Sequence, residues 1–279
     1  MKIAFIGRAE RFSPNSVGRD AAILAAVRRR LSAERDVACA PVVSEDDLAT
    51  AGADMADAQC YVSMARSQDA LNWLGECERQ RVPVVNATAA VMLCNRRPAV
   101  MQLAADEMSV PPAEGSDGYW VKRACGCAQS EADVQYAATR DEAQRLSSTM
   151  EQRGIVDVLV QAHVAGDLVK CYGVRGTDFF RTYYPGDDGQ TKFGYELQGG
   201  RPRHYTYDAA ALHRTLNRVA GRCSLDVYGA DCIIRPDGEP VLIDLNDWPS
   251  FSRCCDEAAE AIARRIMQRM NDEDGTDDI

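Results

Sequence analysis

The chain has 279 residues, a length that suits two or three sub-domains sharing one interior. Its formal net charge of −10 argues against a nucleic-acid-binding protein, because phosphate contacts need a basic face, although a local basic pocket is compatible with an acidic chain. The first apolar run is too short for a signal peptide and no later run approaches the about 20 residues of a membrane span, so we expect a cytoplasmic protein without membrane contact.

Residues 1–90 are predicted to form a small α/β domain. Short apolar runs typical of buried strands alternate with segments of helical periodicity, which predicts a doubly wound parallel sheet with helices on both faces. The strands are expected at residues 3–7, 37–42, 60–64 and 83–86, and the helices at 23–31 and 70–74. The loop 8–16 should lie at the ligand-binding edge, where the carboxyl ends of the strands meet.

The composition changes after Val110-Pro111-Pro112, where proline ends a helix predicted over 96–107. Thr139 and Glu142 have the spacing of a capping box for a helix that reaches residue 153. Further strands are predicted at 119–123, 133–136, 156–161, 168–174 and 179–184, followed by a hairpin or mobile loop over 185–203 and a helix that begins at Asp208.

The eleven cysteines are scattered from Cys39 to Cys255, and an odd number cannot all pair, so we expect mostly reduced thiols. Cys125 and Cys127 lie close together, as do Cys254 and Cys255. Neither pair has the spacing of a structural zinc site.

The most informative segment is a hairpin predicted over residues 228–246. In its turn, residues 235–238, proline fixes φ and glycine accepts a positive φ. Folding about the centre of this turn places Asp231 opposite Asp244, with Asn246 on the same face. Two facing carboxylates repel unless a cation compensates them, and Mg²⁺ needs only a few protein oxygens. The competing interpretation, an exposed hairpin with incidental acids, is disfavoured by the apolar residues around them.

This pattern resembles the ATP-grasp superfamily, in which an acid on one strand is followed by a turn and an acid-x-Asn on the next, here Asp231 and Asp244-Leu245-Asn246. The resemblance spans most of the chain. It implies an α/β pre-domain (1–90), a small lobe (91–165), a large lobe with the metal site (166–270), antiparallel sheets in both lobes, and a disordered acidic tail (271–279). It also implies ATP and Mg²⁺ as cofactors, with Mn²⁺ as an alternative ion, and Asp231, Asp244 and Asn246 as metal ligands.

By the same resemblance, Lys122 matches the lysine that contacts the ATP phosphates, although the loop 125–130 that would close over them has fewer glycines than is usual. Residues 160–164 resemble the hinge whose backbone reads adenine, and Asp167 would take the ribose hydroxyls. The implied nucleotide-binding residues are Arg97, Lys122, Gln161, Ala162, His163, Val164, Asp167 and Lys170. Ordinary solvated side chains remain the alternative for Arg97, Lys122 and Lys170.

Two reactions fit such a site. A ligase of the glutathione synthetase or ribosomal-protein glutamate ligase kind would phosphorylate a carboxylate and join it to an amine, and this interpretation is favoured. A kinase acting on an inositol phosphate-like polyanion is the alternative, because Asp244 before x-Asn resembles the inositol trisphosphate kinases. A nucleotide-binding regulator without turnover is the third.

The substrate is expected to be a small anion, and the oligomeric state is left open. Lys170, Arg181 and Arg203 are the catalytic candidates. The basic residues that could form the substrate pocket, or could be solvated loop charges, are Arg175, Arg181, Lys192, Arg201 and Arg203.

Overall fold

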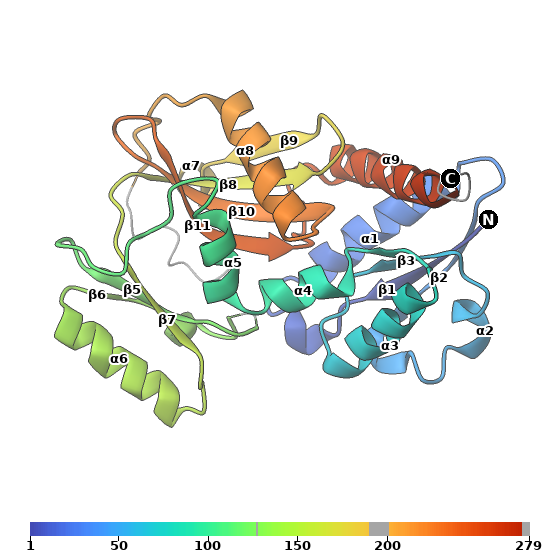
Figure 1. Cartoon of the computed structure of the whole chain (residues 1–279), viewed down its shortest axis with the longest axis horizontal. Helices are drawn as coiled ribbons and strands as arrows, with labels where there is room; N and C mark the ends of the chain where they lie inside the picture. Colours follow the sequence, from blue (N-terminus) through green and yellow to red (C-terminus); the bar gives the residue numbers. More distant parts are fainter. Residues whose placement is uncertain (127, 190–200, 275–279) are drawn as a thin grey trace.

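The computed structural model describes residues 1–126, 128–189 and 201–274. Its strands form one parallel sheet in the order β2-β1-β3-β4 and two antiparallel sheets in the orders β11-β10-β8-β9 and β6-β5-β7 (Figure 1). The predicted α/β class, with antiparallel sheets following a parallel one, is confirmed.

The parallel sheet is built from strands whose side chains alternate between two cores. Ile3 and Phe5 face one buried cluster, while Ala4 and Ile6 face another on the opposite side of the sheet. Helices cover both faces, which confirms the doubly wound prediction. The elements are β1 (Lys2–Gly7), α1 (Val17–Leu31), β2 (Ala38–Ser44), α2 (Gly52–Met55), β3 (Cys60–Ser63), α3 (Gln68–Arg79) and β4 (Val84–Val85), with short 3-10 helices η1 (Glu10–Phe12) and η2 (Glu45–Asp47).

Two short helices, α4 (Thr88–Cys94) and α5 (Arg97–Ala104), lead from the parallel sheet to the antiparallel part. The three-stranded sheet consists of β5 (Tyr119–Arg123), β6 (Val134–Ala137) and β7 (Val158–Ala162), with η3 (Glu131–Asp133) before β6 and α6 (Arg140–Gln152) against the sheet. Thr139 caps α6 by accepting a hydrogen bond from the Glu142 N–H at 3.2 Å, as the capping box predicts.

The four-stranded antiparallel sheet carries the predicted hairpin. Its strands are β8 (Asp167–Val174), β9 (Phe180–Tyr183), β10 (Val227–Ile234) and β11 (Pro240–Asp247), and α8 (Ala209–Arg222) packs on it. Asp208 caps α8 by accepting from the Ala211 N–H at 2.8 Å. In the stretch 185–203, predicted as a hairpin or loop, residues 185–188 form the short helix α7 (Pro185–Asp188), while residues 190–200 lie outside the described residues.

The last helix, α9 (Cys255–Asp274), lies alongside α1 of the parallel-sheet part and also contacts β8 of the four-stranded sheet (Figure 1). Ile262 and Ile266 of α9 are fully buried in the same cluster as Ile23 and Val27 of α1. The helix includes residues 271–274, which we expected in a disordered tail, because it continues one turn beyond the apolar stripe that anchors it. Residues 275–279 of that tail lie outside the described residues.

Asn86 links the parallel sheet to the four-stranded sheet. Its side chain is 1% exposed, donates to the Val227 carbonyl at 2.7 Å and accepts from the backbone N–H groups of Asp226 and Val227, each at 2.8 Å. Three backbone groups at the start of β10 therefore depend on one amide.

We expect Asn86→Ala to lower the free energy of unfolding by about 3 kcal/mol, because it leaves buried backbone groups without partners. Chemical denaturation of this variant, compared with Asn72→Ala on the exposed face of α3, measures the effect. The control should change by less than about 0.5 kcal/mol, and equal stability of the two variants would contradict the structural role of Asn86.

Candidate functional site

Asp231 and Asp244 face each other as predicted, but the register beside the turn differs from the prediction by one residue: Ile234 pairs with Pro240, and a β-bulge next to Asp231 restores the predicted pairing. Asp231 on β10 lies directly opposite Asp244 on β11, and Asn246 follows two residues further on. Gly238 in the turn has φ +84°, a conformation that L side chains rarely adopt, and donates its N–H to the Arg235 carbonyl at 2.9 Å. The turn therefore brings β10 and β11 together, and the bulge at residue 243 places the two carboxylates opposite each other.

Two cations accompany these acids. Arg97 Nε lies 3.1 Å from Asp244 Oδ1, and Lys170 Nζ lies 3.4 Å from Asp231 Oδ2. Asn246 donates its amide N–H to Asp244 Oδ2 at 3.1 Å, so its amide oxygen is the atom suited to ligate a cation. Lys170 thus stands on the strand neighbouring Asp231, in register with it.

Asp244 is held in its charged form. Burial opposes its ionisation, but the positive charges of Arg97 and Lys122 outweigh burial, aided by hydrogen bonds from Asn246 and Arg97, so the pKa of this carboxyl lies below its ordinary value. Lys122 behaves in the opposite way. Burial lowers the pKa of this lysine in spite of the nearby carboxylates of Asp244 and Asp231.

A cavity of about 470 Å³ adjoins the acids on the side of the three-stranded sheet. Trp120, Tyr136 and His163 form an aromatic wall, in which Trp120 Nε1 donates to His163 Nδ1 at 3.1 Å and the Trp120 and Tyr136 ring centroids are 5.6 Å apart. The residues implied to bind the nucleotide that line this cavity are Arg97, Lys122, Gln161, Ala162, His163, Val164 and Asp167.

Asp167 is 6% exposed, and its carboxylate accepts from the backbone N–H groups of Arg203, at 2.9 Å, and Tyr205, at 3.2 Å. It therefore fixes the returning chain beside the cavity, which Pro202 helps to line. Arg203, a catalytic candidate, contributes its backbone to this contact.

A second cavity, of about 220 Å³, lies on the other side of the acids. It shares Arg97, Asp231 and Asp244 with the first, and Lys170 and Asn246 also line it. The loop after β1, which we expected at the ligand edge, supplies further lining residues, namely Arg8, Phe12, Ser13 and Ser16. The two cavities thus meet at the predicted metal site.

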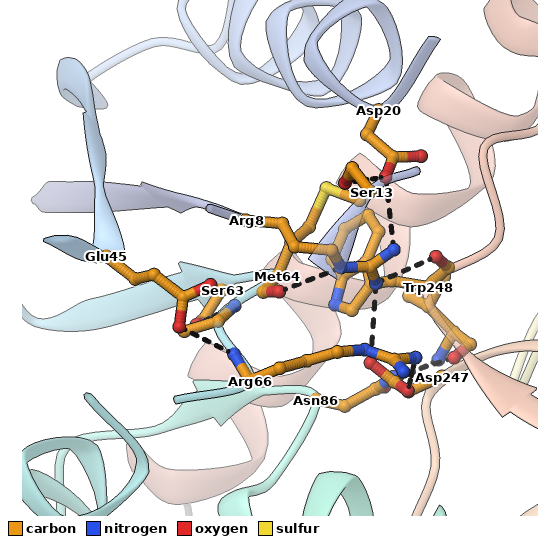
Figure 2. Close-up of polar contacts among 12 residues, drawn as sticks. Arg8, Ser13, Asp20, Glu45, Ser63, Met64, Arg66, Asn86, Asp247 and Trp248 are labelled. Atoms are coloured by element: carbon orange, nitrogen blue, oxygen red, sulfur yellow. Dashed lines mark hydrogen bonds and ion pairs between the residues drawn. The ribbon is translucent and has the colours of Figure 1, made fainter. Parts of the chain in front are cut away.

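Residues of a buried ion network, drawn in Figure 2, line part of the second cavity. Asp247, whose side chain has no exposed surface, forms ion pairs with Arg66 and, at 3.6 Å, with Arg8. Arg8 also lies 3.1 Å from Asp20 Oδ2 and donates to the Trp248 carbonyl at 3.2 Å. The arginines follow β1 and β3, so this network fastens the edge of the parallel sheet to the end of β11.

Glu45 orients the two loops that carry these arginines. It is 5% exposed and accepts from the backbone N–H groups of Ala9, at 2.7 Å, and Ser67, at 2.6 Å. It also accepts from the Arg66 N–H at 2.9 Å (Figure 2). A single carboxylate therefore ties together the chain segments that follow β1 and β3.

Several basic candidates do not reach the acids. Arg181 pairs with Glu257 at the start of α9 and lies over the Phe179 ring at 5.4 Å, so α9 holds it away from both cavities. Arg175 pairs with Asp226 at 2.9 Å. Of the remaining candidates, Arg201 is exposed and Lys192 lies outside the described residues.

Four arginines that line the second cavity were missed by the sequence reasoning: Arg8, Arg19, Arg66 and Arg253. Arg8 and Arg66 carried a usable signal, because each closely follows a strand of the parallel sheet, at the edge where ligands bind. Arg253 carried none, since its place depends on contacts between distant segments.

The donor atoms fit a hard divalent cation. Mg²⁺ favours carboxylate and amide oxygens and retains positions for water and phosphate, which matches two aspartates and one asparagine at the junction of two cavities. Within residues 1–126, 128–189 and 201–274, no three His, Cys, Asp or Glu side chains gather as a metal-binding group. Cys254 and Cys255 are not joined by a disulfide.

Solved structures with the same fold are known, although no protein-family model and no curated protein matches the sequence. A RimK domain protein ATP-grasp from Sphaerobacter thermophilus is 17% identical over 96% of this chain and 100% of that chain, with a TM-score of 0.64. D-alanyl-alanine synthetase A from Vibrio cholerae is 10% identical over 98% of this chain and 99% of that chain, with a TM-score of 0.68. D-alanine–D-alanine ligase from Bacillus anthracis, complexed with ATP, is 13% identical over 98% of both chains, with a TM-score of 0.62.

These similarities extend over nearly the whole of each chain, and at such identities they establish the fold. The chain therefore has the ATP-grasp fold, as the resemblance of its hairpin motif implied. Among the helices that the structure describes, none is long and apolar enough to cross a membrane.

Because of the buried ion network, we expect Asp247→Asn to lower the free energy of unfolding strongly. This change leaves two arginines, each less than 10% exposed, without their shared carboxylate charge, and breaking a buried pair in this way costs about 3 kcal/mol. Denaturant unfolding should show this loss. Asp46→Asn, which disrupts an exposed pair with Arg11, is the matched control and should lose less than about 1 kcal/mol; similar losses in both variants would count against the network.

The lowered pKa of Lys122 leads us to expect that the free energy of unfolding depends on pH. Its pKa in the folded chain lies below its ordinary value of 10.5, so between these values the unfolded chain binds more protons and stability rises with pH. Lys122→Met lacks this contribution. The wild type should therefore gain stability relative to the variant as the pH rises towards 10.5, which paired unfolding curves at matched pH would measure. A difference that does not vary with pH would show that the lysine is not desolvated.

Proposed function

We propose that the protein is an ATP-dependent carboxylate–amine ligase with a small anionic substrate. The observation that carries this proposal is the meeting of two cavities at Asp231, Asp244 and Arg97. One cavity has the size and aromatic lining suited to a nucleotide, and the other is smaller and rich in cations. A phosphoryl group placed between the acids would face both.

The names of the structural neighbours support this choice. One is a synthetase and another is a ligase complexed with ATP. The larger cavity, about 470 Å³, falls within the about 300–1,000 Å³ typical of cofactor pockets. We assign the adenine ring to the wall of Trp120, Tyr136 and His163, where aromatic stacking and the backbone of residues 161–164 are both available.

The phosphate end of the nucleotide is assigned to Lys122 and Arg97. A cation on a strand and a guanidinium on a helix supply the positive charge that phosphate oxygens need. Arg97 Nη1 also donates to the carbonyls of Arg123, at 2.5 Å, and Gly126, at 3.3 Å, so it holds the start of the loop expected to cover the triphosphate.

Asp231, Asp244 and Asn246 are assigned to one or two Mg²⁺ ions. When bound, the metal supplies charge neutralisation for the phosphoryl group in transfer. Arg97 and Lys170 already balance the two carboxylates in this structure, which allows the acids to stay ionised before a metal arrives.

The reaction has two steps. A carboxylate oxygen of the acceptor bonds to the γ-phosphorus of ATP, the bond from that phosphorus to the bridging oxygen breaks, and ADP leaves. An amine then attacks the acyl carbon of the acyl phosphate, phosphate departs, and the nitrogen loses a proton to form an amide. The residues contribute alignment and charge stabilisation rather than a covalent intermediate.

A kinase remains the second candidate. By the family resemblance, Asp244 stands at a position where most ligases of the superfamily carry Glu. The second cavity disfavours a kinase. At about 220 Å³ it offers little room for an inositol phosphate-like polyanion. Mass analysis of products formed from MgATP with pooled carboxylates and amines, or with pooled inositol phosphates, separates the two: a new amide supports the ligase, and an added phosphoryl group supports the kinase.

We expect Asp244→Asn to lower Mg²⁺-dependent turnover of ATP by at least about 100-fold, because it removes a metal ligand and a negative charge. Asp237→Asn, in the exposed turn of the same hairpin, is the matched control and should retain activity. Steady-state kinetics at several Mg²⁺ concentrations measure both. Turnover that survives in Asp244→Asn would overturn the site, and a wild type that binds MgATP without any product would favour a regulator.

A further inference from the structure

The second cavity has an excess of positive charge. Its lining includes six cationic side chains and four carboxylates. The carboxylates are Asp20, Asp231, Asp244 and Asp247, and they form ion pairs with Arg8, Lys170, Arg97 and Arg66. The lining as a whole therefore remains cationic after these pairs, and Arg19 and Arg253 complete its set of cations.

The positive charge extends across the sheet, away from the metal site. Tyr183, Lys170, Asp231 and Asp244 lie in register on four adjacent strands, so their side chains share one face. Neighbouring strands are about 4.8 Å apart, which places Tyr183 roughly 10 Å from Asp231. The Arg253 guanidinium lies over the Tyr183 ring, 5.2 Å from its centroid. The cavity thus has an acidic end for the metal and a basic end at Arg253.

The segment before Arg253 is held in an unusual conformation. Trp248 and Phe251 have positive φ angles, +36° and +48°, which are strained for bulky residues, and both side chains are fully buried. The Trp248 indole donates to the Val85 carbonyl at 3.3 Å, and the Phe251 ring packs against Tyr172 with a centroid separation of 5.5 Å. The packing of these two side chains therefore holds the backbone in the conformation that places Arg253 in the wall of the cavity.

We propose that the acceptor is a small carboxylate that carries a second anionic group, a carboxylate or a phosphate, and that Arg253 binds this second group. The inference rests on the proposed ligase function. The first carboxylate lies beside Lys170 and Arg97, where it meets the γ-phosphate, and the second lies one to two strand spacings away, roughly 5–10 Å. A volume of about 220 Å³, below the about 300 Å³ at which pockets for drug-sized ligands begin, restricts the acceptor to a small molecule.

The experiment uses hydroxylamine in place of the unknown amine. Hydroxylamine attacks the acyl phosphate to give a hydroxamate and phosphate, so acceptors are detected before the natural amine is identified. The full-length protein is incubated with MgATP, hydroxylamine and one of three pools of small acids: monocarboxylates, dicarboxylates, or carboxylates bearing a phosphate. We expect hydroxamates from a dianionic pool at a kcat/KM at least about 10-fold above that of any monocarboxylate.

The variant Arg253→Gln should raise KM for the dianionic acceptor by about 10-fold to 100-fold with a smaller change in kcat, since it removes a charged contact to a non-reacting group. Arg253→Lys should restore part of the affinity. Arg79→Gln, an exposed arginine on α3, is the control and should match the wild type. Thermal unfolding of each variant with MgATP reports whether the nucleotide site is intact.

Each outcome is decisive. Hydroxamates from a dianionic pool, with the Arg253-specific rise in KM, support the proposal, and the pool that reacts shows whether the second group is a carboxylate or a phosphate. Hydroxamates from monocarboxylates at equal efficiency, or an equal loss in Arg253→Gln for both kinds of acid, overturn it and leave the ligase intact. Absence of hydroxamate from every pool overturns the ligase proposal and this inference with it.

Discussion

The buried carboxylate of Asp247 is the contact on which the arrangement of the site depends. It lies between Arg8 and Arg66, which follow strands of the parallel sheet, and it belongs to the strand that also carries Asp244 and Asn246. Because breaking a buried ion pair is costly, this contact holds two parts of the chain in one relative position. The second cavity exists only because that position is maintained, since its walls come from both parts.

The features that could be predicted from the sequence are those set by neighbouring residues. The turn at 235–238 made the hairpin predictable, and Asp231 and Asp244 face each other as predicted, but through a β-bulge next to Asp231 that the turn rules did not predict. The strands carrying Lys122 and Lys170 were likewise predicted, and seven of the residues implied to bind nucleotide line one cavity. Their roles in binding came from the family resemblance and remain proposals.

The features that could not be predicted depend on contacts distant in sequence. The pair between Arg66 and Asp247 joins residues separated by 181 positions, and no local pattern specifies it. The same holds for the packing of α9 against α1. Glu257 of α9 forms an ion pair with Arg181, which therefore does not reach the acids. Arg175 and Arg181, proposed from the sequence for the substrate pocket, do not line the second cavity, whereas the loop 8–16, expected at the ligand-binding edge from the topology of the parallel sheet, contributes Arg8 to it.

Several departures from ordinary local preference lie around the two cavities. A lysine with a pKa lowered by burial, two aspartates facing each other, and two bulky aromatic residues with positive φ all lie in or beside their walls. Each of these features lowers stability and persists only because surrounding packing and ion pairs support it. Their place around this junction agrees with the proposed function, which assigns phosphoryl transfer to the point where the two cavities meet.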